Sequence, residues 1–150
     1  MSKSKIRHFK NYSIVKNGVE ITLNLDRFNK QFQDAQTELD EAVWTSMKPL
    51  LPLNTGLLIQ RTQAINDSLA GTGKVCAAAG PYGRFQYMGK VMVDPVTNSP
   101  WARPGAKKIV TGRSLTYSNP KTTPEWFDEA KRRDGKQWIE KVKETAGGGS

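Results

Sequence analysis

The segment that most constrains this fold is a long run with helical periodicity in the first third of the chain. Apolar side chains recur there every three or four residues, which gives a helix one apolar face. Asn24 can cap the helix, with Leu23 and Phe28 as a hydrophobic staple, and Pro49 and Pro52 stop it because proline lacks a backbone donor. The apolar face consists of Phe28, Phe32, Ala35, Leu39, Ala42 and Val43, and the acids Asp34, Glu38, Asp40 and Glu41 are expected largely off it.

A β-hairpin is predicted immediately before this helix. Residues Val19 to Leu23 alternate apolar and polar side chains, as a half-buried strand does. Asn17-Gly18 in front of them is a tight-turn signal, so Tyr12 to Val15 are expected to pair with this strand.

Residues 53–89 have the pattern of a compact mixed region. Asn54 to Gly56 can turn the chain before a short Leu57 to Ile59 segment, and Lys74 to Ala79 is apolar enough for a strand. Pro81 to Gly89 is interpreted as a short helix, because proline suits the first turn and glycine the C-terminal cap.

The last third is expected to hold strands at Lys90 to Val93 and Lys108 to Val110, continued at Ser114 to Tyr117. Between them, Asp94 to Gly105 is a long polar loop that contains Trp101, and long loops in small domains are usually functional or disordered. A final helix is predicted to start at Thr122-Thr123-Pro124-Glu125 and to run to about Thr145. Its apolar stripe is Trp126, Phe127, Ala130, Trp138 and Val142, and Gly135 is a position where it can bend.

The sequence therefore predicts an α+β fold: a long N-terminal helix, a small antiparallel β-sheet, a short central helix and a C-terminal helix. Residues 1–11 are expected as a basic arm, 12–145 as one domain, and 146–150 as a flexible glycine-rich tail. The chain of 150 residues carries 23 Lys and Arg against 14 Asp and Glu, a formal charge of +9. That excess can face nucleic acid, an acidic protein or solvent. No apolar run approaches the roughly 20 residues that span a bilayer, and no membrane partner is predicted.

Residues suited to catalysis are scarce. His8 is the only histidine and lies in the basic arm, and the single cysteine, Cys76, lies in an apolar run typical of a small buried side chain. Gly71-Thr72-Gly73-Lys74 resembles a phosphate loop but lacks the required spacing, so a tight turn is predicted. We therefore expect no enzyme, no cofactor and no metal site.

Basic residues on the final helix leave two interpretations open. Lys131, Arg132, Arg133 and Lys136 could touch phosphates. Asp128, Glu129, Asp134 and Glu140 alternate with them, however, and such a pattern is typical of a salt-bridged, solvated helix face.

Three motifs in fixed order carry a family resemblance. They are a Thr-Gly-x-Leu segment at Thr55, a Pro-Tyr-Gly-Arg-x-Gln-Tyr-x-Gly segment at Pro81, and a Thr-Thr-Pro-x-Trp-Phe-x-x-Ala helix at Thr122. Together they resemble the minor capsid protein family of tailed phages that infect Gram-positive bacteria, which is related to the neck or tail-completion proteins typified by the lambda gene Z product. Gly83 stands where a common form of the family has alanine, and residues 90–120 are longer than the family leads us to expect.

The resemblance implies a structural subunit of the phage neck, or head–tail connector, made in the host bacterial cytoplasm and located in the virion. It implies a ring, expected as a hexamer, between head-closure or adaptor proteins and the tail terminator or tail tube, with phage double-stranded DNA passing nonspecifically through its axis. Such a subunit needs protein interfaces and no catalytic centre. A tail terminator or head-closure ring protein, and a small basic nucleic-acid-binding protein, remain alternatives.

Aromatic and arginine side chains are the candidates for subunit contacts, because interface energy concentrates on such residues. These candidates are Tyr82, Arg84, Phe85, Tyr87, Trp101 and Arg103. The segment from Pro81 to Gly89 is expected to be a structural hub, and Trp101 the anchor of a docking loop. We also expect some of the basic residues to face DNA or an acidic neighbouring ring. The candidates are Lys107, Lys108, Lys131, Arg132, Arg133 and Lys136.

Overall fold

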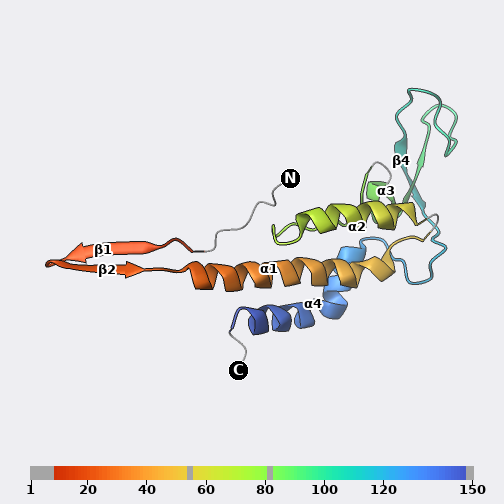
Figure 1. The fold of residues 1–150 in the computed structure, drawn as a ribbon. Coiled ribbons are helices and arrows are strands. Elements are labelled where there is room, and N and C mark those ends of the chain that lie inside the picture. The colour runs from red at the N-terminus through yellow and green to blue at the C-terminus, as the bar shows by residue number, and fades with distance from the viewer. Residues whose placement is uncertain (1–8, 54–55, 81–82, 148–150) are drawn as a thin grey trace.

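The computed structural model describes residues 9–53, 56–80 and 83–147. In chain order these form a hairpin of two strands, a long helix, two shorter helices, a second pair of strands and a C-terminal helix (Figure 1). The elements are β1 (Tyr12–Lys16), β2 (Val19–Leu23), α1 (Asp26–Met47), the 3-10 turn η1 (Lys48–Leu50), α2 (Leu57–Leu69), α3 (Gly83–Met88), β3 (Lys90–Val93), β4 (Ile109–Ser114) and α4 (Trp126–Thr145). The predicted α+β class is confirmed, although the strands form two separate two-stranded sheets instead of one.

Helix α1 lies at the centre, with α2 along one side and α4 along the other (Figure 1). The core lies between these helices, where residues from the C-terminal half of α1 meet α4. Its buried members are Val43, Trp44, Met47, Leu50, Leu51, Trp126, Ala130 and Trp138. As predicted, α1 ends just before Pro49, and the apolar stripe of α4 faces the core.

The start of α1 differs from the prediction. The helix begins at Asp26 after Leu25, because Asn24 uses its side-chain oxygen to accept from the backbone N–H of Asp26, 2.9 Å away, in a local turn. Leu23 and Phe28 both remain exposed, so the predicted staple does not cover apolar surface. Asp40, expected largely off the apolar face, is buried.

The region after η1 also corrects the sequence analysis. Leu57 to Ile59 is the first turn of the thirteen-residue helix α2, and Lys74 to Ala79 is irregular instead of a strand. The polar side chains of α2 explain this. Asn66 accepts from the backbone N–H of Cys76 (2.7 Å) and donates to its carbonyl (2.9 Å), while Thr62 accepts from the N–H of Ala79. Backbone groups that would otherwise need a partner strand are satisfied in this way.

Strands β1 and β2 form the predicted hairpin, which extends beyond the N-terminal end of α1 (Figure 1). Asn17 and Gly18 both have positive φ, 53° and 76°, as a two-residue hairpin turn requires. The expected half-burial is wrong: all ten strand residues are exposed, because nothing in the described chain covers either face.

Helix α4 starts at Trp126, two residues after Pro124, which lies in the predicted start segment. Glu125 precedes it in a left-handed conformation, with φ of 54°, and no side chain caps the helix. Thr122, in the segment where the helix was expected to start, is buried. The tight turn in front of the helix is held by Asn119, whose side-chain amide donates to the carbonyls of Pro49 and Leu51. This contact fixes the approach to α4 against the end of α1.

Candidate functional site

The second hairpin and its connecting loop form a projection at the opposite end of the molecule from β1–β2 (Figure 1). We call residues 90–114 the β3–β4 arm. Its strands are antiparallel, and the register shifts between Lys90 and Met92, which marks a β-bulge. The predicted loop between the strands is present, and the region 115–117 predicted to continue the second strand is irregular.

Asp94 organises the loop of this arm. Its carboxylate has no solvent-exposed surface, although the paired Arg103 side chain is half exposed. One oxygen accepts from the backbone N–H groups of Val96 and Thr97, at 2.8 and 3.2 Å. The other accepts from the backbone N–H of Arg103 (3.0 Å) and from its guanidinium Nε (2.8 Å). These bonds tie the start of the loop and Arg103, nine residues after Asp94, to one side chain.

The same hydrogen bonds set the charge of Asp94. The Arg103 guanidinium, followed by the backbone N–H groups, lowers the pKa of the Asp94 carboxyl well below its usual range. Arg103 is a predicted interface residue; its side chain binds Asp94 within its own loop and is half exposed, and its contact with a partner stays a prediction. The structural role of Asp94 was not predicted from the sequence, which placed it only at the start of the loop. The sequence signal that could have indicated this role is Asp-Pro at the start of a turn.

Trp101 lies on this braced loop and is 84% exposed. Its backbone N–H makes a local contact, donating to the Ser99 hydroxyl oxygen 3.1 Å away. Trp101 is therefore not packed against the described part of the chain. Its role as an anchor on a neighbour stays a prediction.

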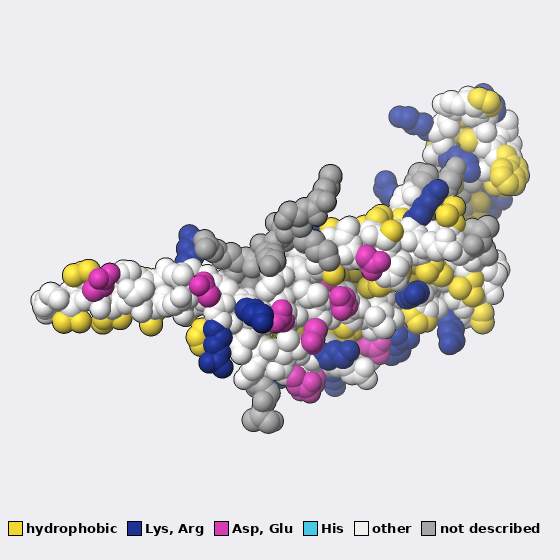
Figure 2. Space-filling model, viewed as in Figure 1, with side chains coloured by type: hydrophobic (Ala, Val, Ile, Leu, Met, Phe, Trp, Pro, Cys, Tyr) yellow, Lys and Arg dark blue, Asp and Glu magenta, His cyan; other side chains and the backbone are white. Residues whose placement is uncertain are grey.

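The arm is also strongly basic. Five cations, Lys90, Arg103, Lys107, Lys108 and Arg113, stand against one acid, Asp94, a formal balance of +5 − 1 = +4. Because Asp94 is buried against Arg103, no acid of the arm faces solvent. Figure 2 shows Lys and Arg side chains around this projection, together with exposed hydrophobic ones. This surface includes two residues predicted to face DNA or an acidic partner. Lys107 is exposed and Lys108 is half-buried.

Helix α3 joins the arm to the core. Tyr87 packs edge-on against Trp126, with ring centroids 4.8 Å apart, and its carbonyl accepts from the Glu125 N–H. Gly89 ends the helix with φ of 69°, as predicted. Burial raises the pKa of Tyr87, in agreement with a packing role.

The remaining predicted contact residues of this segment have different positions. Arg84 is exposed and lies 6.0 Å above the half-buried Phe85 ring, and Tyr82 lies outside the described residues. A structural role is therefore confirmed for Tyr87. Whether any of these residues contacts another subunit stays a prediction.

The basic residues of α4 are divided between pairing and exposure. Arg132 bonds Glu129 at 2.5 Å, and Arg133 bonds both Asp134 (2.8 Å) and the carbonyl of Ser46 on α1 (3.0 Å). Each guanidinium lowers the pKa of the carboxyl that it binds. Lys131 and Lys136 are exposed on the same helix. For the two arginines, the structure favours the salt-bridged interpretation.

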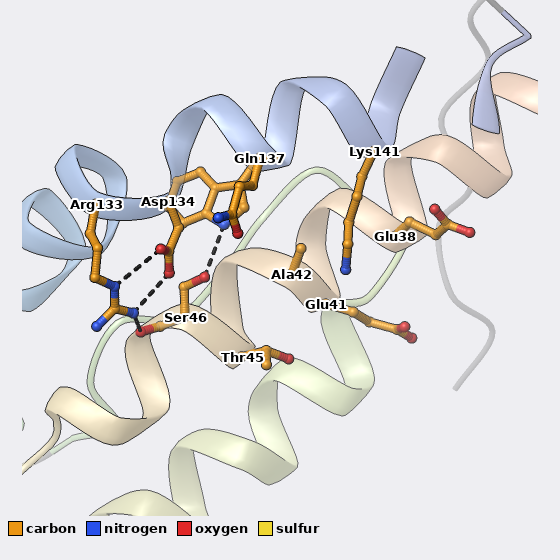
Figure 3. Close-up of a pocket in the computed structure, with 10 residues that line it drawn as sticks. Glu38, Glu41, Ala42, Thr45, Ser46, Arg133, Asp134, Gln137 and Lys141 are labelled. Carbon is orange, nitrogen blue, oxygen red and sulfur yellow. Dashed lines mark hydrogen bonds and ion pairs between the residues drawn. The ribbon is translucent and has the colours of Figure 1, made fainter. Parts of the chain in front are cut away.

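A groove of about 540 Å³ runs between α1 and α4 beside this cluster (Figure 3). Trp138 forms part of its wall and donates from its indole N–H to the Ser46 hydroxyl, 3.0 Å away. The other lining residues are Glu38, Glu41, Ala42, Thr45, Arg133, Asp134, Gln137 and Lys141. Acids and bases alternate along it, and neither a histidine nor a cysteine lines it.

The glycine-rich turn has a different function from phosphate binding. The backbone N–H groups of Gly71 and Gly73 both donate to one carboxylate oxygen of Asp40, each at 2.9 Å. Its other oxygen accepts from the Gln36 amide. Because a carboxylate of the chain occupies the amides that a phosphate would use, the predicted tight turn is confirmed.

Groups of three or more His, Cys, Asp or Glu that could hold a metal ion do not occur among the described residues. Within that part of the chain, no helix is long and apolar enough to cross a membrane. The basic N-terminal arm up to residue 8, with His8, and the end of the glycine-rich tail lie outside the described residues.

The sequence and fold match no protein-family model, no curated protein and no solved structure.

Proposed function

We propose that this chain is a structural subunit of the tailed-phage neck that assembles into a ring joining head to tail, and that it is not an enzyme. The observation that carries the proposal is the β3–β4 arm. Asp94 accepts four hydrogen bonds from within its own loop, yet the loop presents Trp101 84% exposed. A loop braced by internal hydrogen bonds that carries an uncovered aromatic side chain is suited to docking, because bracing reduces the conformational entropy lost on binding.

The partners follow from the resemblance and the surface chemistry. The motifs at Thr55, Pro81 and Thr122 resemble a neck protein family, which supports head-closure proteins and a tail terminator as neighbours. The basic arm suits DNA in the channel or an acidic neighbouring ring. A tail terminator or head-closure ring protein has the same requirements and is the nearest alternative.

A small nucleic-acid-binding protein is the second candidate, favoured by the +4 balance of the arm and its exposed tryptophan. The two functions differ in location. A neck subunit is found in purified virions at a fixed copy number, whereas a free nucleic-acid-binding protein stays in the cell lysate.

The test is to inactivate the gene in its phage and examine the particles by cryo-electron microscopy and mass spectrometry. We expect DNA-filled heads and free tails, and rescue by the wild-type chain with its density in the neck. Rescue should fail with Trp101→Ala and succeed with Ile139→Ala, an exposed apolar residue of α4. Normal tailed virions without the protein contradict the proposal.

A further inference from the structure

Most of the net positive charge of the chain lies in one segment. Residues 68–124 carry eight Lys and Arg and one acid, a formal balance of +8 − 1 = +7 out of the +9 of the whole chain. This segment includes α3 and the β3–β4 arm, and its one acid is Asp94, which is buried against Arg103. In the view of Figure 2 the Asp and Glu side chains lie over the hairpin and the helices, and Lys and Arg side chains surround the arm.

The cations of the arm are distributed from its base to its loop. Lys90 and Arg113 lie at the base of the strands, Lys107 and Lys108 come directly before β4, and Arg103 lies on the loop. From Lys108 to Arg113 an extended chain covers about 17 Å, whereas a nucleic-acid strand carries one charge per roughly 3.4 Å in duplex geometry. Several phosphates of one strand can therefore lie along the arm. A surface without an exposed acid suits such a uniform polyanion better than a protein surface of mixed charge.

Trp101 adds a flat aromatic face to this basic surface. Its side chain is 84% exposed, whereas the other three tryptophans of the chain are at most 7% exposed. The half-exposed guanidinium of Arg103 lies two residues further along the same loop. Aromatic rings among cations are typical of surfaces that bind single-stranded nucleic acid, where bases stack on the rings and cations contact the phosphates.

A hollow of about 200 Å³ lies next to this loop, and Pro100, the residue before Trp101, forms part of its wall. Its lining combines apolar side chains such as Phe85 and Met92 with Lys90 and Lys108, and it contains no acid. The hollow is smaller than the roughly 300–1,000 Å³ of sites that enclose a whole small molecule. It therefore suits one unit of a longer anionic ligand, with an apolar ring and a phosphate.

We propose that the β3–β4 arm binds single-stranded nucleic acid, with its cations on the phosphates and Trp101 stacked on a base. Stacking needs a base with an accessible face, which an unpaired strand offers and the interior of a duplex does not. Duplex DNA therefore contacts the cations alone. The inference rests on the proposed function only for the presence of nucleic acid, and it requires neither a ring nor a place in the neck.

Tryptophan fluorescence tests this contact in the full-length chain, because Trp101 is the exposed one of its four tryptophans. The probe is an oligothymidylate of about 15 nucleotides, within the usual range of site sizes. We expect it to quench the fluorescence and to bind more weakly as salt rises. A duplex of the same length should bind and leave the fluorescence unchanged. Oligouridylate is titrated in parallel, and the tighter of the two single strands identifies the sugar of the preferred ligand.

Substitutions of the loop separate stacking from charge. Trp101→Ala should weaken single-strand binding about fivefold or more, as expected from the loss of one stacked base, and should leave duplex binding unchanged. Trp101→Phe retains an aromatic ring, so it should keep most of the affinity and lose the quenching. Val96→Ala, at a 72% exposed apolar residue of the same loop, is the matched control and should bind like the wild type. Circular dichroism should be the same for all variants.

Equal affinities of Trp101→Ala and wild type for oligothymidylate overturn the stacking contact. Polyglutamate that quenches Trp101 as strongly as the oligonucleotide overturns the proposal in favour of an acidic protein partner. A chain that is located in the neck but binds neither single strand overturns this inference alone. A chain that binds the single strand with quenching but is absent from virions overturns the proposed function alone.

Discussion

At the scale of single residues, two buried carboxylates organise irregular backbone in this protein. Asp94 binds Val96, Thr97 and Arg103 of the β3–β4 loop, and Asp40 binds the turn at Gly71 to Gly73. A carboxylate suits this position because it offers several acceptor sites, and bonds to a charged acceptor are stronger than neutral ones.

Asp40→Ala should destabilise the fold, because it leaves the N–H groups of Gly71 and Gly73 without their acceptor. An unsatisfied buried donor costs about 1–3 kcal/mol. Because Gly71 is buried and Gly73 is exposed, we expect the free energy of unfolding to fall by about 1–3 kcal/mol. Urea denaturation followed by circular dichroism measures this. Asp34→Ala, an exposed acid on the same helix, is the control and should change little.

The lowered pKa of Asp94 predicts that the stability of the loop in the β3–β4 arm depends on pH. Its pKa is lowered in the folded state, so the carboxylate stabilises the loop at pH values above the ordinary aspartate pKa, near 3.9. That stabilisation is lost as the pH falls further toward the lowered folded pKa. Hydrogen exchange should show Val96, Thr97 and Arg103 protected at pH 5, less protected at pH 2, and unprotected at both in Asp94→Ala. Equal protection of Asp94→Ala and wild type contradicts this prediction.

At the scale of elements, α1 and α4 make the core, and short connections set their positions. Gly89 connects α3 to β3 beside the start of α4, where an added Cβ would be 2.6 Å from Pro124 Cγ. Gly135 lies within α4, where an added Cβ meets only Lys131 Cγ, at 3.7 Å. The same substitution should therefore have opposite effects at these two glycines.

Gly89→Ala should lower the free energy of unfolding by more than 1 kcal/mol, since it combines a steric clash with a left-handed φ of 69°. Gly135→Ala should raise it by roughly 0.5–1 kcal/mol, the usual gain in a helix interior. Thermal denaturation of the two variants measures both. A stabilising Gly89→Ala contradicts the observed close approach of Gly89 to Pro124.

At the scale of the whole molecule, the helical body carries projecting two-stranded sheets at its two ends (Figure 1). The hairpin end is neutral and apolar, and the arm end is basic.

The arm should bind duplex DNA without sequence preference. Replacing Lys90, Lys107 and Arg113 by glutamine removes three cations of the arm. The affinity should fall at low salt, and the slope of log K against log salt should become shallower by up to about 2–3, given roughly 0.9 per phosphate contact. Fluorescence anisotropy at several salt concentrations measures this.

Arg132→Gln with Arg133→Gln is the control, because both arginines are bound to acids of their own helix. This pair should change the slope less than the arm variant does. An equal change from both sets of substitutions places the DNA contact outside the arm.

Local sequence determined the elements whose pattern is strong. The periodicity of Phe28 to Val43, the prolines at 49 and 52, the Asn17-Gly18 turn and the stripe of α4 each predicted what the structure contains. In these segments, period, turn chemistry and helix breakers act over a few residues, so no distant contact is needed to fix the conformation.

Tertiary structure decided the conformation of the remaining segments, because their backbone groups are satisfied by side chains that are distant in the sequence. Asn66 and Thr62 bind residues 76 and 79, which keeps an apolar segment from pairing as a strand. Asp40 meets a turn more than thirty positions later, and burial of this acid has no local signal. The hairpin's alternation fixed its two faces, but whether a face is covered depends on a partner surface, and the described chain supplies none.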